Sequence, residues 1–388
     1  MIIRLTRKYI ESSLWTFLLA VSLCAMAIAS IVAIVWLQET LEAHASRQAK
    51  GIDLVVGAKG SGLQNTLAAI YHADVPNGNI PLSAVNQLAA HPMIARTEPI
   101  SLGDSVGGAR IVGARNTYFD LYEAVPAEGS LPQAPLDAVL GANVAKRLQL
   151  KIGDRFVGSH GLAEGGEAHD SHPYTVVGVL RPTGRVIDEL VVTPLESVWI
   201  AHEGHTASTE PEVTFALLTL RSPIAMATLP RQINGQTNLH ATSPANESAR
   251  LLSNFGWVAV IVKAFAFALI LSATLATFAA LSQALERRQI DVALLRAMGV
   301  SRANVGKLLI AEALAIVVCA AVIALVLVGL AAYWLAHAAL PGLALNIGFG
   351  LTVFAVAAVS AVLLALVASL PTLIRAYRLD VAAQLSRT

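Results

Sequence analysis

The sequence is poor in charged residues. Only 14% of its 388 residues are Asp, Glu, Lys or Arg, whereas 55% are hydrophobic and the mean hydropathy is +0.62. Charge this sparse is unusual for a soluble protein and typical of a membrane protein. The formal net charge is +1, and no basic stripe lies outside the flanks of the apolar runs. A nucleic-acid partner is therefore not expected.

Cysteine is also scarce. The chain has two, Cys24 and Cys319, and both fall inside apolar runs. The long polar region at 38–254 has none, which excludes a disulfide or a thiolate metal site there. We expect both thiols to behave as small buried hydrophobic side chains.

The motifs of common nucleotide and catalytic sites are missing as well. The glycine-rich stretch DLVVGAKGSGLQN does not have the spacing G-x-x-x-x-G-K-[ST], which occurs nowhere in the chain. Lys59 in that stretch is expected to be a loop cation. No G-x-S-x-G elbow supports Ser/His/Asp catalysis. The chain is therefore expected to be neither an ATPase of this type nor an enzyme.

Four apolar runs dominate what is present. Each is long enough to cross a bilayer as a helix, and we expect transmembrane helices over 14–37, 255–282, 308–335 and 349–370, the last stopped by Pro371. Ala27-Ile28-Ala29 also resembles a signal-peptide cleavage site. Because the apolar run continues to Leu37, an uncleaved first span is favoured.

Lys and Arg placement predicts the orientation. Residues 1–13 resemble an amphipathic helix on the cytoplasmic membrane surface. They carry Arg4, Arg7 and Lys8, and segments 283–307 and 371–388 are also basic, whereas the loop 336–348 has no Lys or Arg. Basic segments favour the cytoplasm. Both termini are thus expected in the cytoplasm, with 38–254 and the short loop 336–348 outside.

The polar region alternates between helix and strand patterns. Residues 38–52 look helical and extend the first span. Further helices are expected over 82–91, 141–148, 194–202 and 223–234, the last weakened by Pro230. Strands are expected over 95–106, 109–115, 174–181, 189–193 and 213–221, with one more after Asp154. Such alternation predicts an α+β domain.

The segment QALERRQIDVALLRAMGVSRANVGK (283–307) is basic and amphipathic. Ile290, Ala293, Leu294 and Ala297 recur at helical spacing, and Gly299 can end the helix. One interpretation is a solvated loop that only fixes membrane topology. The other is a docking element through which a soluble ATPase acts on the membrane helices.

The run ERRQIDVALLRAMGVSRANV resembles the cytoplasmic coupling segment of MacB/FtsX-like (type VII) ABC-transporter permeases. The family pattern is roughly E-R-x-x-E-I-x-x-L-R-A-x-G. Its second half is matched by Asp291, Val292, Leu295, Arg296, Ala297 and Gly299, with Asp in place of Glu and Val in place of Ile. Glu286 lies one residue further upstream than the pattern asks.

The resemblance extends over essentially the whole chain. In the polar region, VLGANVAKRLQLKIGDRF and YTVVGVL resemble segments of MacB-like permeases. The layout of one span, a large outer domain and three more spans is also that of the family.

The resemblance implies the fold class. The implied fold is an α+β membrane protein with four transmembrane helices and a large extracytoplasmic (periplasmic) α/β domain inserted between the first and second helices. The domain is MacB-like, with helical stalk ends and two α/β subdomains, the second inserted in the first.

The resemblance also implies a function. The chain would be the permease subunit of an ATP-binding-cassette transporter in a bacterial inner membrane, passing ATP-driven motion to its periplasmic domain (mechanotransmission). Its partners would be two ATPase subunits holding ATP and Mg²⁺, a second permease copy, and a periplasmic or lipoprotein partner. The residues expected to contact the ATPase are Glu286, Arg287, Arg288, Asp291, Val292, Leu294, Leu295, Arg296 and Gly299.

Two other functions are compatible with the pattern. An FtsX-like regulatory scaffold would activate a periplasmic partner instead of moving a substrate, although FtsX-like members usually have a smaller outer domain. A membrane sensor without an ATPase would leave the coupling segment unexplained.

Histidines gather in the second half of the polar region. The candidate metal ligands are His160, His169, His172, His202 and His205. Imidazole with neighbouring carboxylates suits Zn²⁺, which favours a metal-linked envelope process. The spacing is not H-E-x-x-H, so a metalloprotease is not expected. The alternative is a solvated Gly/His-rich hairpin without a defined role.

His72 and Asp74 form a second candidate, since they can pair with each other or ligate an ion. The alternative is a turn built by Pro76, Asn77 and Gly78. Asp53 and Asp188 are polar residues to which the sequence assigns no role.

Overall fold

The computed structural model describes residues 14–159, 172–201, 210–254, 256–287, 298, 300–338 and 348–378. The chain divides into two units. We call Met1–Leu41 with Phe255–Thr388 the helical unit and Glu42–Asn254 the α/β unit.

The described part of the helical unit holds four long helices. They are α2 (Leu14–Gln48), which continues into the α/β unit, α10 (Gly256–Arg287), α12 (Arg302–Ala338) and α13 (Leu351–Arg378). Each contains a segment long and apolar enough to cross a membrane, judged by length and composition. The four predicted spans therefore correspond to four helices.

The predicted end of the last span is wrong. Helix α13 continues through Pro371 to Arg378 instead of stopping at the proline. Proline removes one backbone donor but fits the helical φ, and neighbouring helices make such residues tolerable in apolar helices. Thr372 is fully buried beside the proline, so this stretch packs within the unit.

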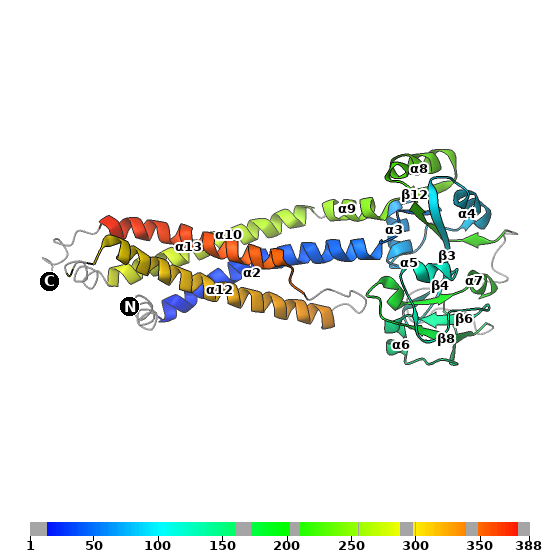
Figure 1. Ribbon diagram of the computed structural model, residues 1–388, viewed down its shortest axis with the longest axis horizontal. Coiled ribbons are helices and arrows are strands. Elements are labelled where there is room, and N and C mark those ends of the chain that lie inside the picture. Colours follow the sequence, from blue (N-terminus) through cyan, green and yellow to red (C-terminus); the bar gives the residue numbers. More distant parts are fainter. Residues whose placement is uncertain are drawn as a thin grey trace. The chain divides into compact units, whose positions relative to one another are not determined.

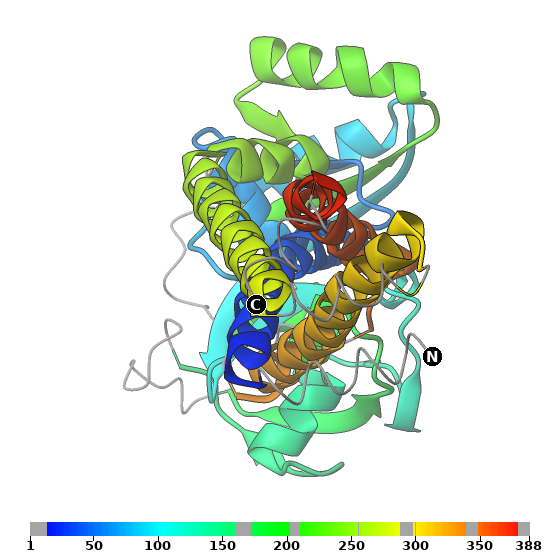
Figure 2. The same cartoon turned by 90° about the vertical axis from the view of Figure 1, so that its left-hand side faces the viewer.

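Small side chains line the contacts between these helices. Helix α13 packs against α12 and α10 (Figure 2). Buried alanines recur at four- or seven-residue spacing along α12 and α13, at Ala313, Ala320, Ala324, Ala357, Ala361 and Ala365. Small residues allow backbones to approach closely where no water drives association. Small residues thus let the helices pack closely at these positions, beside larger core side chains such as Ile28, Trp36 and Ile316.

The two cysteines differ in environment. Cys24 of α2 is buried, and its Sγ lies 3.1 Å from Thr277 Oγ1 of α10. Cys319 of α12 is exposed, so the prediction that both thiols are buried is wrong for this residue. The exposed face of this helix is apolar, and a hydrophobic thiol is compatible with such a face.

The α/β unit is built on one mixed sheet. The strand order is β12-β1-β11-β3-β4-β9-β6-β8-β5, and β7 also pairs with β8. A separate ribbon joins β2 (Ile80–Pro81) and β10 (Glu212–Val213). The strands of the main sheet are β1 (Leu54–Ala58), β3 (Ile94–Val106), β4 (Ala109–Ala114), β5 (Pro126–Gly129), β6 (Asp137–Leu140), β7 (Arg155–Phe156), β8 (Tyr174–Leu180), β9 (Leu190–Thr193), β11 (Phe215–Leu220) and β12 (Leu239–Thr242).

The order of the strands shows a nested topology. One end of the sheet uses strands from the beginning and end of the unit, β1, β3, β11 and β12. The other end uses β5 to β9, which lie between them in sequence. The pairs β4–β9 and β6–β8 are parallel, whereas the others are antiparallel. The inserted part, strands β5 to β9, therefore belongs to the same sheet as the strands from the beginning and end of the unit.

Helices flank this sheet at several places (Figure 1). They are α3 (Gly62–Ile70), α4 (Leu82–Ala89), α5 (Thr117–Leu121), α6 (Ala142–Leu148), η1 (Val186–Glu189), α7 (Leu195–Ala201), α8 (Pro223–Gln236) and α9 (Pro244–Asn254). The predictions of helices at 82–91, 141–148 and 194–202 are confirmed. Helix α8 runs through Pro230 and is longer than predicted.

Apolar side chains on the strands form separate cores. Strand β8 alternates buried and half-buried residues along its length, as a strand with one covered face does. One core gathers Ile52, Val112, Tyr118, Tyr122 and Phe215 with their neighbours. It joins the start of β1, strand β4 and helix α5, and it lies next to the residues described below.

Candidate functional site

In the α/β unit, a polar cluster of described residues lies at the C-terminal end of helix α2. We call it the junction site. It comprises the last turn of α2 and the two residues beyond it, the end of α5 with the two residues that follow, and the segment from the end of β8 through η1. Its residues are Gln48, Lys50, Leu121, Tyr122, Glu123, Thr183, Arg185, Val186 and Asp188.

Asp188 shapes the loop that carries the site. Its carboxylate accepts hydrogen bonds from Thr183 N at 2.9 Å, Thr183 Oγ1 at 2.9 Å and Gly184 N at 2.8 Å. Gly184 has a φ of +69°, a conformation that favours glycine. The sequence T-G-R-V-I-D therefore folds back on its own aspartate, whose carboxylate holds the backbone four and five residues before it.

Arg185 is the central side chain of the junction site and is 7% exposed. Its Nη1 donates to Leu121 O at 2.8 Å. Its Nη2 donates to Gln48 O at 3.2 Å and to Lys50 O at 2.9 Å. The guanidinium thus satisfies carbonyls at the end of α2, which lack partners within the helix. A cation at a helix C-terminus also complements the helix dipole.

The contact is reinforced from the other side. Gln48 Oε1 accepts a hydrogen bond from Val186 N at 2.7 Å, so α2 and the loop are bonded in both directions. Lys50 Nζ lies 2.6 Å from Glu123 Oε1, in an exposed ion pair that adds little stability by itself. Gly51, with a φ of +86°, then turns the chain into β1.

Two buried tyrosines lie beside Arg185. The guanidinium carbon is 4.3 Å from the centre of the Tyr122 ring, and the Tyr122 and Tyr118 rings are 4.9 Å apart. Burial raises the pKa of both phenols, so both are neutral. Burial also lowers the pKa of Arg185, whereas the neighbouring tyrosines and Glu123 act in the opposite direction.

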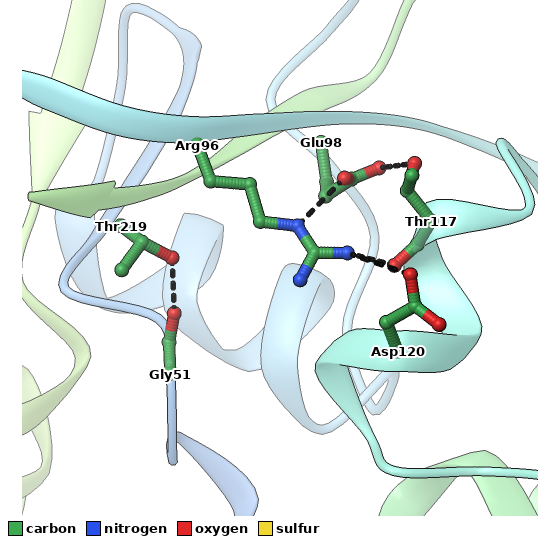
Figure 3. Close-up of polar contacts among 6 residues, drawn as sticks. All are labelled: Gly51, Arg96, Glu98, Thr117, Asp120 and Thr219. Carbon is green, nitrogen blue, oxygen red and sulfur yellow. Dashed lines mark hydrogen bonds and ion pairs between the residues drawn. The ribbon is translucent and has the colours of Figure 1, made fainter.

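Helix α5, which leads to Tyr122, is held to the sheet by charged groups (Figure 3). Arg96 Nε donates to Glu98 Oε1 at 2.9 Å, and Thr117 Oγ1 donates to Glu98 Oε2 at 2.8 Å. Arg96 also bonds Thr117 O and lies 3.7 Å from Asp120 Oδ2. Gly51 O accepts a hydrogen bond from Thr219 Oγ1 at 2.6 Å. Strand β11 is therefore bonded to Gly51, three residues beyond the end of α2, and strand β3 is bonded to α5.

Most of the sequence-predicted site residues lie outside the described ranges. Of the predicted ATPase contacts, Glu286 is exposed on the last turn of α10, and the backbone of Arg287 ends that helix. Arg288, Asp291, Val292, Leu294, Leu295, Arg296 and Gly299 lie outside the described residues. The coupling segment therefore stays a prediction.

The metal prediction has the same status. Among its five histidines only His172 is described, half-buried just before β8, while His160, His169, His202 and His205 lie outside the described residues. Within the described ranges no group of three or more His, Cys, Asp or Glu could hold a metal ion. Zinc binding stays a prediction.

His72 does not pair with Asp74, and the turn that the sequence favoured at this place agrees with the structure. His72 is 6% exposed, and neither ring nitrogen has a hydrogen-bond partner among the described residues. Asp74 Oδ1 instead accepts from Val75 N. Asn77 donates to Ser61 O and to Asn65 Oδ1, which agrees with the alternative of a built turn.

Sequence reasoning missed the roles of Asp188 and Arg185. Asp188 stood out as a polar residue without a role, and Arg185 was not singled out. A usable signal was the stretch T-G-R-V-I-D, in which an aspartate follows a Thr-Gly turn at the distance needed to close it. Asp53, the other residue without a role, accepts from Leu220 N at 2.7 Å and fixes the start of β1.

Two family models match the chain. A MacB-like periplasmic core domain covers residues 17–236, which is more than half of the chain, and an FtsX-like permease C-terminal domain covers residues 263–381. No curated protein matches the chain.

Solved structures show a weaker likeness. The periplasmic region of MacB from Actinobacillus actinomycetemcomitans is 15% identical at a TM-score of 0.36, covering 53% of this chain and 96% of that one. The extracellular domain of the noncanonic ABC-type transporter YknZ from Gram-positive bacteria is 12% identical at a TM-score of 0.32, covering 50% of this chain and 99% of that one. These low scores do not bear on function. The family models, in a chain that has four apolar helices and an α/β domain, show that the chain belongs to the MacB/FtsX-like ABC-transporter permeases.

Proposed function

We propose that this permease couples ATP hydrolysis by separate ATPase subunits to motion of its periplasmic domain, through helix α2. The family membership gives the permease role and an ATPase partner. The mechanical role of α2 is supported by its length and by the contacts that hold its end.

The observation that carries the proposal is the continuity of α2. The helix runs unbroken from Leu14 to Gln48, 35 residues, and its first part is one of the four candidate spans. A helix rises about 1.5 Å per residue, so its length of about 50 Å exceeds the roughly 30 Å hydrocarbon core of a bilayer. One continuous helix is therefore long enough to cross a membrane and to continue into the α/β unit.

The junction site supplies the second half of the argument. Arg185 bonds the carbonyls of Gln48 and Lys50, and Gln48 in turn bonds Val186. A displacement of the last turn of α2 has to carry the β8–η1 loop with it or break these bonds. Helix α5 shares the same arginine through Leu121 O, so the displacement reaches the sheet as well.

The input to this motion is proposed to enter at the coupling segment. Arg287, Arg288 and Arg296 would contact an acidic groove of the ATPase, while Leu294 and Leu295 fill an apolar pocket. Protein interfaces commonly combine charged contacts, which fix how the two partners align, with buried apolar contacts, which supply much of the binding energy. Rigid-body movement of attached helices is a common response to closure of such partners.

The proposed assembly contains two ATPase subunits and two permease copies. Both termini and the coupling segment face the cytoplasm, following the distribution of Lys and Arg. Labelling single cysteines at Gln232 and Gln283 with a membrane-impermeant maleimide checks this orientation. Only the first should react in intact spheroplasts, and reaction of only the second would reverse the orientation.

A pull-down of the full chain in mild detergent tests the ATPase contact. The native chain should retain an ATPase, and the triple variant Arg287→Glu, Arg288→Glu, Arg296→Glu should lose most of it. The matched control replaces Arg155, Arg231 and Arg250 by Glu, which makes the same charge change in the α/β unit. An ATPase that is retained equally by all three chains, or by none, would contradict the proposal.

A further inference from the structure

A pocket of about 390 Å³ opens beside the junction site, on the α/β unit. Four of its lining residues are cations, Arg47, Lys50, Arg181 and Arg185, and one is an acid, Glu123. The formal charge of this lining is four positive against one negative, or +3. Volumes of about 300–1,000 Å³ are usual for small-molecule sites. The pocket is large enough for a small anionic group.

The single acid does not neutralise the cations. Glu123 Oε1 is 2.6 Å from Lys50 Nζ and so belongs to that pair. Within the described ranges, no carboxylate lies at ion-pair distance from Arg47, Arg181 or Arg185. Three arginines from two separate segments therefore converge on one hollow without a negative partner. Such an arrangement concentrates positive potential in a concave surface.

Arg185 is the innermost of these cations. It is 93% buried, given its 7% exposure, and its partners are three carbonyls and the Tyr122 ring. Its Nε is buried without a hydrogen-bond acceptor among the described residues. A buried cation with no carboxylate at ion-pair distance carries a desolvation cost that a bound anion would offset.

The other walls of the pocket set the shape of an occupant. Arg47 and Arg181 are exposed at its edge, where their side chains can close on a ligand. Tyr122 and Val125 add an apolar wall. A phosphate carries up to two negative charges and offers several acceptors, and guanidinium groups match it in charge and geometry. A single carboxylate would leave most of the positive charge unbalanced.

We propose that this pocket binds the phosphate group of a small ligand, held between Arg47 of α2 and Arg181 and Arg185 of the β8–η1 loop. The phosphate can belong to a free phosphorylated solute or to a phospholipid headgroup. Because the pocket draws on both the end of α2 and the loop, an occupant bridges the two segments. The binding itself does not depend on the ATPase.

Calorimetry of the full chain in a neutral detergent tests the proposal with two probes, inorganic phosphate and short-chain dihexanoyl phosphatidic acid. The pocket variant is Arg47→Glu with Arg181→Glu, since both residues are exposed and leave the bonds of Arg185 intact. The control variant is Arg155→Glu with Arg231→Glu, two exposed arginines of the same unit. Both should unfold at the same temperature as the native chain.

The native chain is expected to bind at least one probe. The pocket variant should bind it at least about tenfold more weakly, a change of about 1.4 kcal/mol, whereas the control should stay within about twofold. Tight binding of both probes would indicate a free solute as the source, and binding of phosphatidic acid alone would indicate a lipid headgroup. Absence of binding by both probes, or equal weakening in the two variants, would overturn the proposal.

Discussion

At the scale of single residues, Asp188 shows how a local turn creates a long-range contact. Its carboxylate closes the Thr183–Gly184 turn, and that turn directs Arg185 towards the carbonyls at the end of α2. The aspartate never touches α2 itself. Its effect on the junction is therefore one of positioning, through the backbone of five residues.

Replacing Asp188 by Asn should destabilise the α/β unit by about 2 kcal/mol, because charge-assisted bonds to two backbone N–H groups and a hydroxyl are weakened. Urea unfolding of the full chain, followed by Trp fluorescence, measures this. The exposed Glu196→Gln change, which also removes one negative charge, should have little effect. Equal stability of the native chain and the Asp188 variant would show that the turn does not depend on the carboxylate.

His72 is a second residue whose environment predicts a measurable effect. Burial, with the nearby positive charge of Arg110, lowers its pKa from 6.5 to about 3. The folded ring therefore stays neutral down to about pH 3, whereas the ring in the unfolded chain gains a proton below about pH 6.5. Between these values the unfolded chain binds more protons, so stability falls as pH falls.

The variant His72→Asn tests this linkage. Asn tolerates the φ of +50° at this position and does not titrate. Between about pH 7 and pH 5 the native chain should lose about 2 kcal/mol more stability than the variant. The comparison uses unfolding curves at both pH values, so that the cavity left by the smaller side chain cancels. Equal pH dependence of the two chains would mean that His72 does not titrate between folded and unfolded states.

At the scale of elements, helices and strands with clear patterns were predictable. Strand β8 and helix α4 agree with the sequence to within a few residues, because their alternation and helical spacing are uninterrupted. Pro371 misled the prediction, since it lies inside helix α13 instead of ending it, whereas Pro230 lies inside α8 within the helix expected there. In each case the surrounding residues pack the helix on both sides of the proline, and tertiary contacts outweigh the local cost.

The candidate site was harder to predict than the elements. The helical character of 38–52 was correct as far as Gln48, but nothing in the sequence pairs Gln48 with Val186, 138 residues away. Contacts of this kind depend on how the sheet orders its strands. The coupling segment could be proposed from sequence because its residues are neighbours in the chain, and it stays a prediction.

At the scale of the whole molecule, the proposed transmission of motion depends on one helix that the two units share. Helix α2 belongs to the helical unit up to Leu41 and to the α/β unit from Glu42. Interrupting the helix at this boundary should therefore affect the transmission of motion without affecting the binding of the ATPase. The ATPase would still bind at the coupling segment, but its motion would no longer reach the junction site.

The most direct test compares two seven-residue insertions after Leu41. A Gly/Ser insertion interrupts the helix, whereas an Ala-rich insertion of equal length continues it with a phase change of only about 20°. Each chain is purified with its ATPase, and amide hydrogen exchange is measured at residues 42–50 and 181–188, without nucleotide and with ADP and vanadate.

If motion passes through α2, nucleotide should change the amide hydrogen exchange of both segments in the native and Ala-rich chains. In the Gly/Ser chain, which should still retain the ATPase, the change should disappear. A Gly/Ser chain that responds to nucleotide as the native chain does would contradict transmission through α2. A native chain whose junction site does not respond to nucleotide would contradict it as well.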